Sequence, residues 1–190
     1  MDRKKMETAV RHFLDAMDTG AAAFPGADVD RTPARVAQAW CEDLVSGYQL
    51  DPDAQMSWQP VENERGVVVV RNITFASVCI HHLLPFAGRA HVAYLPAARQ
   101  AGLSKVGRVI DAHARRLQTQ EHLTGSIADT LERTLEPRGV VVLLSAEHTC
   151  MTLRGVRKEQ AQMATIESRG CYSTDAVERA SLLSLLREGA

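Results

Sequence analysis

The sequence predicts an α+β fold, and three observations support this. Apolar residues recur at three-and-four spacing near both ends of the chain and in its centre, which is the period of amphipathic helices. Short runs rich in Val and Ile stand between these segments, as expected of β-strands. Hydrophobic residues make up 45% of the 190 residues and charged residues 24%, which excludes a disordered or low-complexity chain.

Residues 1–60 are expected to form an N-terminal helical region. A first helix is predicted over Lys4–Thr19, and a break rich in Gly and Ala follows over Gly20–Asp30. Its apolar stripe consists of Met6, Val10, Phe13, Leu14 and Met17. Thr32 as N-cap and Pro33 as first helical residue predict a second helix, which Gly47 ends.

Residues 61–190 are expected to form a single integrated domain with the order strand, strand, helix, helix, strand, strand and a last helix. The expected strands are Gly66–Phe75, Gly88–Leu95, Gly139–Ala146 and Met151–Val156, and the expected helices are Lys105–Leu117, Gln120–Leu135 and Thr174–Arg187. Met151–Val156 is interpreted as the hairpin partner of the strand before it, after a bend at Glu147–Cys150.

Charge and cysteine content narrow the classes of partner and compartment. Lys and Arg number 22 against 23 Asp and Glu, so the formal charge of -1 gives no global field for a polyanion, and no nucleic acid is expected. No run of about 18 apolar residues is present, so we expect no membrane contact and a cytoplasmic protein. Four widely spaced cysteines favour a metal or catalytic role over a disulfide framework.

One group of residues has the composition of a zinc site. Cys79 and His82 are three residues apart, and Cys150 can supply a third ligand from a bend elsewhere in the sheet. Thiolate and imidazole are the preferred ligands of zinc, and an open fourth position allows water to be activated. The alternative is that these are ordinary core cysteines and surface histidines. If zinc is bound, His81 and His148 are proton donors or acceptors beside the metal, or residues that orient its ligands.

Further polar residues surround these segments in the sequence. Lys105 and Arg108 follow Ser104 at a predicted helix start, and Arg154 lies just after the second metal segment, near Arg157 and Lys158. Together they could hold a phosphate chain, whereas each taken alone is more simply a solvated surface charge. Glu121 could accept hydrogen bonds from a guanine-like edge, although on sequence alone a favourable contact with the helix dipole is the better interpretation.

Several motifs together resemble GTP cyclohydrolase I. They match in order and at concordant separations from about Arg31 to Gly170. The matching segments are Arg31–Ala37, Ser77–Phe86, Gly102–Lys105, Arg116–Glu121, His148–Met151 and Arg154–Val156. The resemblance implies the tunnelling fold, an antiparallel ββααββ sheet with helices on one face. It also implies a toroidal homo-oligomer, expected to be a decamer, with each active site at a subunit boundary.

The resemblance also implies a reaction and a set of site residues. GTP and water would give 7,8-dihydroneopterin triphosphate and formate, through hydrolytic opening of the imidazole ring and rearrangement of the ribose. Zn²⁺ would be the cofactor. Its ligands would be Cys79, His82 and Cys150; His148, His81 and Ser104 would be catalytic; Glu121 and Gln120 would contact guanine; and Lys105, Arg108 and Arg154 would bind the triphosphate.

One residue departs from the family motif in an informative way. The motif reads Cys-Glu-His-His, and here Ile80 replaces the glutamate. His122 also stands where arginine is common, and Gln160–Ile166 is poorer in Ser and Thr than its counterpart. Three hypotheses therefore remain: a GTP cyclohydrolase I, a divergent paralogue that hydrolyses a modified purine nucleotide in a specialised pathway, and a non-catalytic GTP-binding homologue.

Overall fold

A computed structural model describes residues 1–17, 29–62 and 66–187. The chain separates into two compact units, Met1–Ser46 and Gly47–Ala190, each of which is described by itself. The boundary expected at residue 60 remains a prediction, because compactness does not test which part folds independently. None of the helices in the described part of the chain has the length and apolar content needed to span a bilayer.

The first unit is helical, as the sequence predicts. Helix α1 spans Arg3–Ala16, and the Asp2 side chain caps it by accepting a hydrogen bond from the Lys5 amide. The second helix is composite: the 3₁₀ turn η2 (Val29–Arg31), the α-helix α2 (Thr32–Gln38) and the π-helical turn η3 (Ala39–Leu44). Most of the expected break lies outside the described residues.

The start of α2 corrects one local prediction. Arg31, not Thr32, occupies the N-cap position, and no side chain caps the helix there. Pro33 lies in the first turn, where its missing amide hydrogen costs nothing, because the first turn has no intrahelical acceptors to bond.

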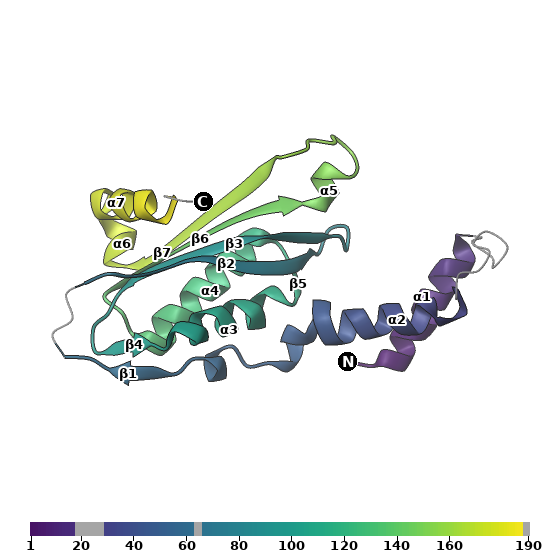
Figure 1. Cartoon of the computed structure of the whole chain (residues 1–190), viewed down its shortest axis with the longest axis horizontal. Coiled ribbons are helices and arrows are strands. Elements are labelled where there is room, and N and C mark those ends of the chain that lie inside the picture. Colours follow the sequence, from purple (N-terminus) through teal and green to yellow (C-terminus); the bar gives the residue numbers. More distant parts are fainter. Residues whose placement is uncertain (18–28, 63–65, 188–190) are drawn as a thin grey trace. The chain divides into compact units, whose positions relative to one another are not determined.

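The second unit is built on a five-stranded sheet with the order β5-β2-β3-β6-β7 (Figure 1). Its strands are β2 (Val68–Cys79), β3 (Pro85–Leu95), β5 (Leu117–Gln118), β6 (Gly139–His148) and β7 (Gln162–Gly170). The four long strands are antiparallel, and only the short β5 runs parallel to its neighbour β2. A small second sheet pairs β1 (Trp58–Pro60) with β4 (Arg99–Ala101).

Helices cover both faces of this sheet, and the ββααββ order is confirmed. Helices α3 (Leu103–Ala114) and α4 (Gln120–Leu135) pack on one face, over Val92, Val142 and Leu144. The opposite face is covered at one end by α7 (Ala176–Arg187), whose Leu182 and Leu186 contact Val141 and Leu143. Alternate residues of β6 thus enter two different cores, which explains why the strand is apolar without a break from Gly139 to Leu144.

The implied arrangement with helices on one face therefore holds for α3 and α4 but omits α7. The predicted hairpin partner of β6 is also wrong. Residues expected as a strand from Met151 form part of the short helix α5 (Thr149–Thr152) and a turn, and the partner strand is β7. The 3₁₀ turns η4 (Ser46–Gln49) and η5 (Asp53–Gln55) and the short helix α6 (Cys171–Thr174) were not expected.

Both edges of the sheet are open within the described ranges. β7 pairs only with β6, and the outer edge of β2 pairs only at Val78 and Cys79, where β5 adds two residues. An open edge presents unpaired backbone donors and acceptors that another chain can pair with.

A buried histidine links α3 and α4. His113 Nε2 lies 2.9 Å from Thr130 Oγ1, and Arg133 binds Asp53 nearby. Burial, with a smaller contribution from Arg116, lowers the pKa of His113 from 6.5 to about 4. The imidazole is therefore neutral in the folded protein at neutral pH.

This burial predicts a pH dependence of stability. The unfolded chain binds a proton at His113 below pH 6.5 and the folded chain only near pH 4, so the contribution of His113 is complete above pH 6.5 and is lost as the pH falls to about 4. A pKa shift of this size corresponds to a change of about 3 kcal/mol in the free energy of unfolding. We expect urea unfolding at pH 7.5 and 5 to show a smaller loss of stability on acidification for His113→Gln than for the wild type. The same loss in both proteins would contradict this, and His12→Gln, at an exposed position, serves as the control.

Candidate functional site

Two segments that are distant in sequence meet at one end of the sheet. The turn between β2 and β3 follows Cys79, and α5 follows His148 at the end of β6. Antiparallel pairing places Phe86 opposite His148, and Thr149 Oγ1 donates to the Pro85 carbonyl at 2.6 Å. The register of β3 and β6 therefore brings the two cysteine-bearing segments together.

Backbone hydrogen bonds hold Cys79 in the turn. Its amide donates to the Leu84 carbonyl at 2.9 Å, and its carbonyl accepts from the Leu83 amide at 2.9 Å. Leu83 has a φ of 55°, a left-handed conformation that is costly for a branched side chain and is retained here to close the turn. The Cys79 thiol is thus presented from a fixed backbone.

Cys79, His148 and Cys150 form a group able to hold a metal ion. One donor atom from each residue lies within 4.8 Å of the other two. Cys79 is buried, and His148 and Cys150 are partly buried. Two sulfurs and an imidazole nitrogen suit a borderline-soft divalent ion with tetrahedral preference.

The electrostatics of the two thiols also favour a cation. Burial raises the pKa of Cys150, the neighbouring Cys79 raises it further, and the opposing effect of Arg154 is smaller. Two adjacent, partly buried thiolates repel each other, so their joint ionisation requires a compensating positive charge between them. The donor set therefore fits a divalent metal.

The other two predicted residues of the turn lie at its surface. His81 Nδ1 is 3.8 Å from Cys79 Sγ, and the rings of His81 and His82 are 6.3 Å apart and nearly perpendicular. Both side chains are exposed, and His82 is not part of the group formed by Cys79, His148 and Cys150. Ile80, on the same turn, is 45% exposed.

His148 is held from two sides. Its ring stacks on Phe86 with centroids 4.5 Å apart and an interplanar angle of 4°. On its edge, Nε2 lies 2.9 Å from Gln120 Oε1 at the start of α4. Burial lowers the pKa of His148, and the carboxylate of Glu121 opposes this. Glu121 is exposed in the first turn of α4.

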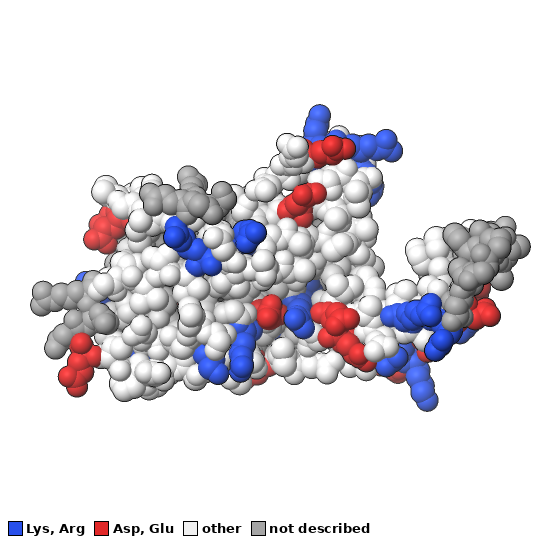
Figure 2. Space-filling model, in the orientation of Figure 1, with Lys and Arg blue, Asp and Glu red and all other residues white. Residues whose placement is uncertain are grey.

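Positive charge gathers beside this group. Figure 2 shows blue side chains over the connection between α5 and β7, where Arg154, Arg157 and Lys158 are exposed. Arg154 is close enough to the metal group to lower the pKa of Cys150. An anionic part of a ligand bound at the thiols would be stabilised there.

The remaining predicted residues lie elsewhere on the same chain. Ser104, Lys105 and Arg108 are on the first turns of α3, which begins at Leu103 rather than at Lys105. A Cβ on Gly107 would lie 4.0 Å from Ile73, which precedes Cys79 by six residues of strand. Because each residue of a strand advances about 3.3 Å, the part of α3 beside Ile73 is separated from Cys79 by about 20 Å along the strand.

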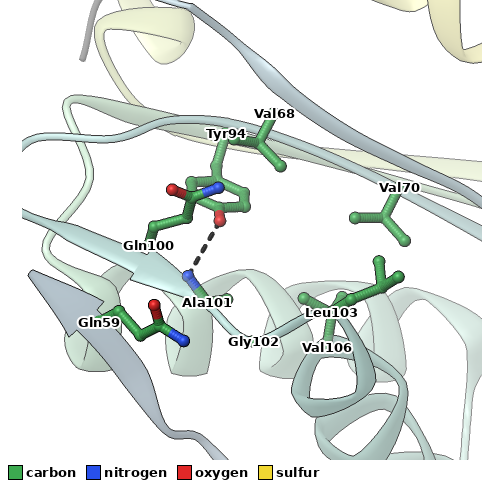
Figure 3. Close-up of a pocket in the computed structure, with 9 residues that line it drawn as sticks. All are labelled: Gln59, Val68, Val70, Tyr94, Gln100, Ala101, Gly102, Leu103 and Val106. Carbon is green, nitrogen blue, oxygen red and sulfur yellow. Dashed lines mark hydrogen bonds between the residues drawn. The ribbon is translucent and has the colours of Figure 1, made fainter. Parts of the chain in front are cut away.

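A cavity of about 300 Å³ marks this distant region (Figure 3). It lies between the start of β2, the small sheet and the first turn of α3, and the Tyr94 hydroxyl at its wall accepts a hydrogen bond from the Ala101 amide at 3.0 Å. None of the residues predicted to act in the site lines it.

Comparison with known proteins assigns the family. The model of the family described as GTP cyclohydrolase I matches residues 6–187. This chain belongs to the GTP cyclohydrolase I family. The GTP cyclohydrolase 1 of Streptococcus agalactiae serotype Ia is 42% identical over 194 residues, which cover 99% of both chains.

Other relatives in the GTP cyclohydrolase I family give the same result. The GTP cyclohydrolase 1 of Mycobacterium leprae (strain Br4923) is 44% identical, with 97% of this chain and 89% of the relative covered. That of Rhodopirellula baltica is 41% identical over all of this chain and 81% of the relative. A solved structure titled as the archaeosine synthase QueF-Like in the apo form reaches a TM-score of only 0.46 at 14% identity, over 55% of this chain and 93% of that chain, a similarity too low to bear on function.

Sequence reasoning did not find Phe86 as a support of the site. Its position opposite His148 depends on strand register, which no local pattern specifies. The sequence also does not indicate the inward direction of Gln120, because its place after Thr119, the N-cap of α4, fixes its position in the first helical turn but not the direction of its side chain.

The cysteine pair predicts a specific loss of metal. Cys79→Ser and Cys150→Ser should each remove the stoichiometric divalent metal from the purified protein, because a hydroxyl is a poor replacement for a thiolate ligand. Elemental analysis of each variant measures this. Cys171→Ser, a partly buried cysteine outside the group, is the matched control and should keep its metal.

The same measurement separates the two candidate nitrogen ligands. Metal loss in His82→Asn with retention in His148→Asn assigns the third position to His82, and the reverse assigns it to His148. Full metal content in Cys150→Ser would contradict the thiol pair as the core of the centre.

Proposed function

We propose that this protein is a zinc-dependent GTP cyclohydrolase I, which converts GTP and water to 7,8-dihydroneopterin triphosphate and formate. The observation that carries the proposal is the joining of two thiols and an imidazole at one end of the sheet, in a chain of this family. GTP, or a related purine nucleotide, is the proposed substrate. The proposed compartment is the cytoplasm.

The proposed zinc ligands are Cys79, Cys150 and His82. The two thiols are close together, and His82 lies three residues after Cys79 on an exposed turn, where its side chain has room to change rotamer. When bound, zinc supplies a Lewis acid that lowers the pKa of a water molecule enough to make it a nucleophile at neutral pH.

His148 is proposed to carry the proton for opening of the purine ring. Its ring is fixed by Phe86 and Gln120 beside the thiols, and burial favours its neutral form once a proton has been given away. His81, 3.8 Å from Cys79 Sγ, is proposed to act with Ser104 in the ribose steps.

Binding of the nucleotide divides between its two ends. Glu121, exposed in the first turn of α4, is proposed to accept the amidine edge of guanine. Lys105, Arg108 and Arg154 are proposed to hold the triphosphate. The family resemblance implies that Gln120 contacts guanine, and this role stays a prediction. In the structure the Gln120 side chain is buried and its amide is hydrogen-bonded within the protein.

The site is proposed to be completed by a second copy of the chain. Ser104, Lys105 and Arg108 lie on the part of α3 beside Ile73, about 20 Å along the sheet from Cys79, and are proposed to serve the metal centre of a neighbouring copy. The open edges of β2 and β7 are suited to pairing between copies. Both points support a toroidal homo-oligomer, proposed to be a decamer, with its active sites at subunit boundaries.

Ile80 favours a second candidate function. An exposed apolar side chain stands beside the two turn histidines, where the family motif has a carboxylate. The alternative is a divergent paralogue that opens a modified purine nucleotide, or a homologue that binds GTP without turnover.

Product analysis tests the proposal directly. Zinc-loaded protein incubated with GTP should release formate and give a pterin that fluoresces after oxidation, in equal amounts. Mass spectrometry of the products identifies them, and a panel of purine nucleotides run in parallel reveals a different preferred substrate. A zinc-loaded protein that leaves GTP intact would refute the proposal, and recovery of turnover in Ile80→Glu would then identify the binding homologue.

Mixing two inactive variants tests the shared site. Lys105→Ala and Cys150→Ser are each expected to be inactive alone. Co-expressed at equal levels, they should recover about one quarter of wild-type activity, because that fraction of boundaries draws the intact residue from each partner. Lack of recovery in oligomers shown by mass spectrometry to contain both variants would place all the residues of a site on one chain.

A further inference from the structure

The side chain of Gln120 is buried and fully engaged. It is 1% exposed, and its Nε2 lies near three acceptors. These are the Leu144 carbonyl at 3.2 Å, the Met163 carbonyl at 2.9 Å and Thr165 Oγ1 at 3.0 Å. Its Oε1 faces His148 Nε2 at 2.9 Å. Gln120 therefore connects α4, β6 and β7 to the imidazole beside the two thiols.

The two backbone carbonyls determine the orientation of this amide. Carbonyl oxygens accept hydrogen bonds and cannot donate them. If the amide were turned around, its oxygen would face the Leu144 and Met163 carbonyls, so lone pairs would oppose each other in a buried place and both hydrogen bonds would be lost. The NH₂ group must therefore face β6 and β7, and Oε1 must face the histidine.

The orientation of Gln120 in turn determines which nitrogen of His148 carries hydrogen. Gln120 Oε1 is only an acceptor, so His148 Nε2 must donate. In the neutral imidazole one nitrogen is protonated and the other bears a lone pair. The lone pair of neutral His148 is then at Nδ1.

Two hydroxyl groups reinforce the arrangement. Thr124 Oγ1 donates its single hydrogen to the backbone carbonyl of Gln120 at 2.7 Å. In the 2.6 Å contact between the Thr124 and Thr165 hydroxyls, Thr165 is therefore the donor. Thr165 Oγ1 is left as an acceptor for the Gln120 amide. The hydrogen bonds thus run in one direction from the Gln120 amide through Thr165 and Thr124 to the Gln120 backbone carbonyl, which resists reversal of the amide.

We propose that Gln120 is a positioning residue that holds neutral His148 in the tautomer protonated at Nε2, which leaves the ring lone pair at Nδ1. Phe86 fixes the plane of the ring, and Gln120 fixes its edge. The effect of this tautomer on turnover, through the proton step proposed above for His148, is the second part of the inference. The second part of this inference rests on the proposed function.

This role differs measurably from a guanine contact. A guanine contact would contribute to binding of the nucleotide, so its loss would raise KM. A positioning residue acts on the proton transfer through His148, so its loss should lower kcat by about 10–100-fold and change the KM for GTP by less than about twofold.

The tautomer is observable without turnover. Solid-state NMR of the zinc-loaded protein containing ¹³C,¹⁵N-histidine distinguishes a protonated from an unprotonated ring nitrogen at each carbon-assigned position. Comparison with His148→Gln identifies the His148 signals among the seven histidines. We expect hydrogen on Nε2 and none on Nδ1. The opposite pattern in the wild type would overturn the inference.

A pair of buried glutamines supplies the variant and its control. Gln120→Met keeps the length of the side chain and removes the amide, so the His148 signals should split between tautomers and kcat should fall. Gln118→Met removes another buried amide, whose Nε2 donates to the His113 carbonyl at 2.6 Å and to Ser77 Oγ at 3.2 Å. Because Gln118 does not contact His148, its replacement should leave the His148 nitrogen signals unchanged.

The outcomes separate this inference from the proposed function. Unchanged His148 signals in a folded Gln120→Met, or a raised KM with unchanged kcat, would overturn the positioning role. Should Gln120→Met fail to fold, the wild-type spectrum alone still decides the tautomer. Hydrogen on Nε2 in a protein that leaves GTP intact supports the tautomer and refutes the proposed function. GTP turnover with hydrogen on Nδ1 refutes the tautomer and supports the proposed function.

Discussion

The pairing of β3 with β6 is the constraint on which the rest of the site depends. Its register places Phe86 opposite His148, and a shift by one residue would turn every side chain of β6 to the other face. Such a shift is strongly disfavoured because β6 contributes to two cores, with Val142 and Leu144 on one face and Val141 and Leu143 on the other. The hydrophobic core thus determines where the thiols meet.

The chemistry of the site follows from what this register brings together. Two thiols near each other and partly removed from water are hard to ionise, since burial and mutual repulsion both raise the pKa of Cys150. A divalent ion removes both penalties, so metal binding and ionisation are coupled there. The adjacent imidazole is kept in place by a stack and a hydrogen bond, so it does not depend on the metal for its orientation.

Sequence reasoning succeeded where the signal was local. The period of apolar residues located α4 at Gln120–Leu135 with both ends correct. Residue type and spacing grouped Cys79 and Cys150, which the structure brings together with His148, but named His82 as the third ligand. It failed where the signal was tertiary. Met151 looks like the start of a strand because it follows a bend, yet β7 begins only at Gln162, after a long connection. The direction of the Gln120 side chain depends on carbonyl groups of β6 and β7, which no pattern along α4 can reveal.

The positions of the basic residues bear on how the proposed active site would be assembled. Arg154 follows α5, the helix that carries Cys150, whereas Lys105 lies in the first turn of α3, beside the opposite end of β2. The length of β2 holds these two regions apart, and the α3 helix packs against its buried face. Both ends of a nucleotide could still be served if identical copies are arranged so that the end that carries the thiols in one copy lies next to the end that carries Lys105 in another. An active site built this way exists only in the assembly, so any change that weakens the contact between copies would reduce activity without touching a residue of the metal centre.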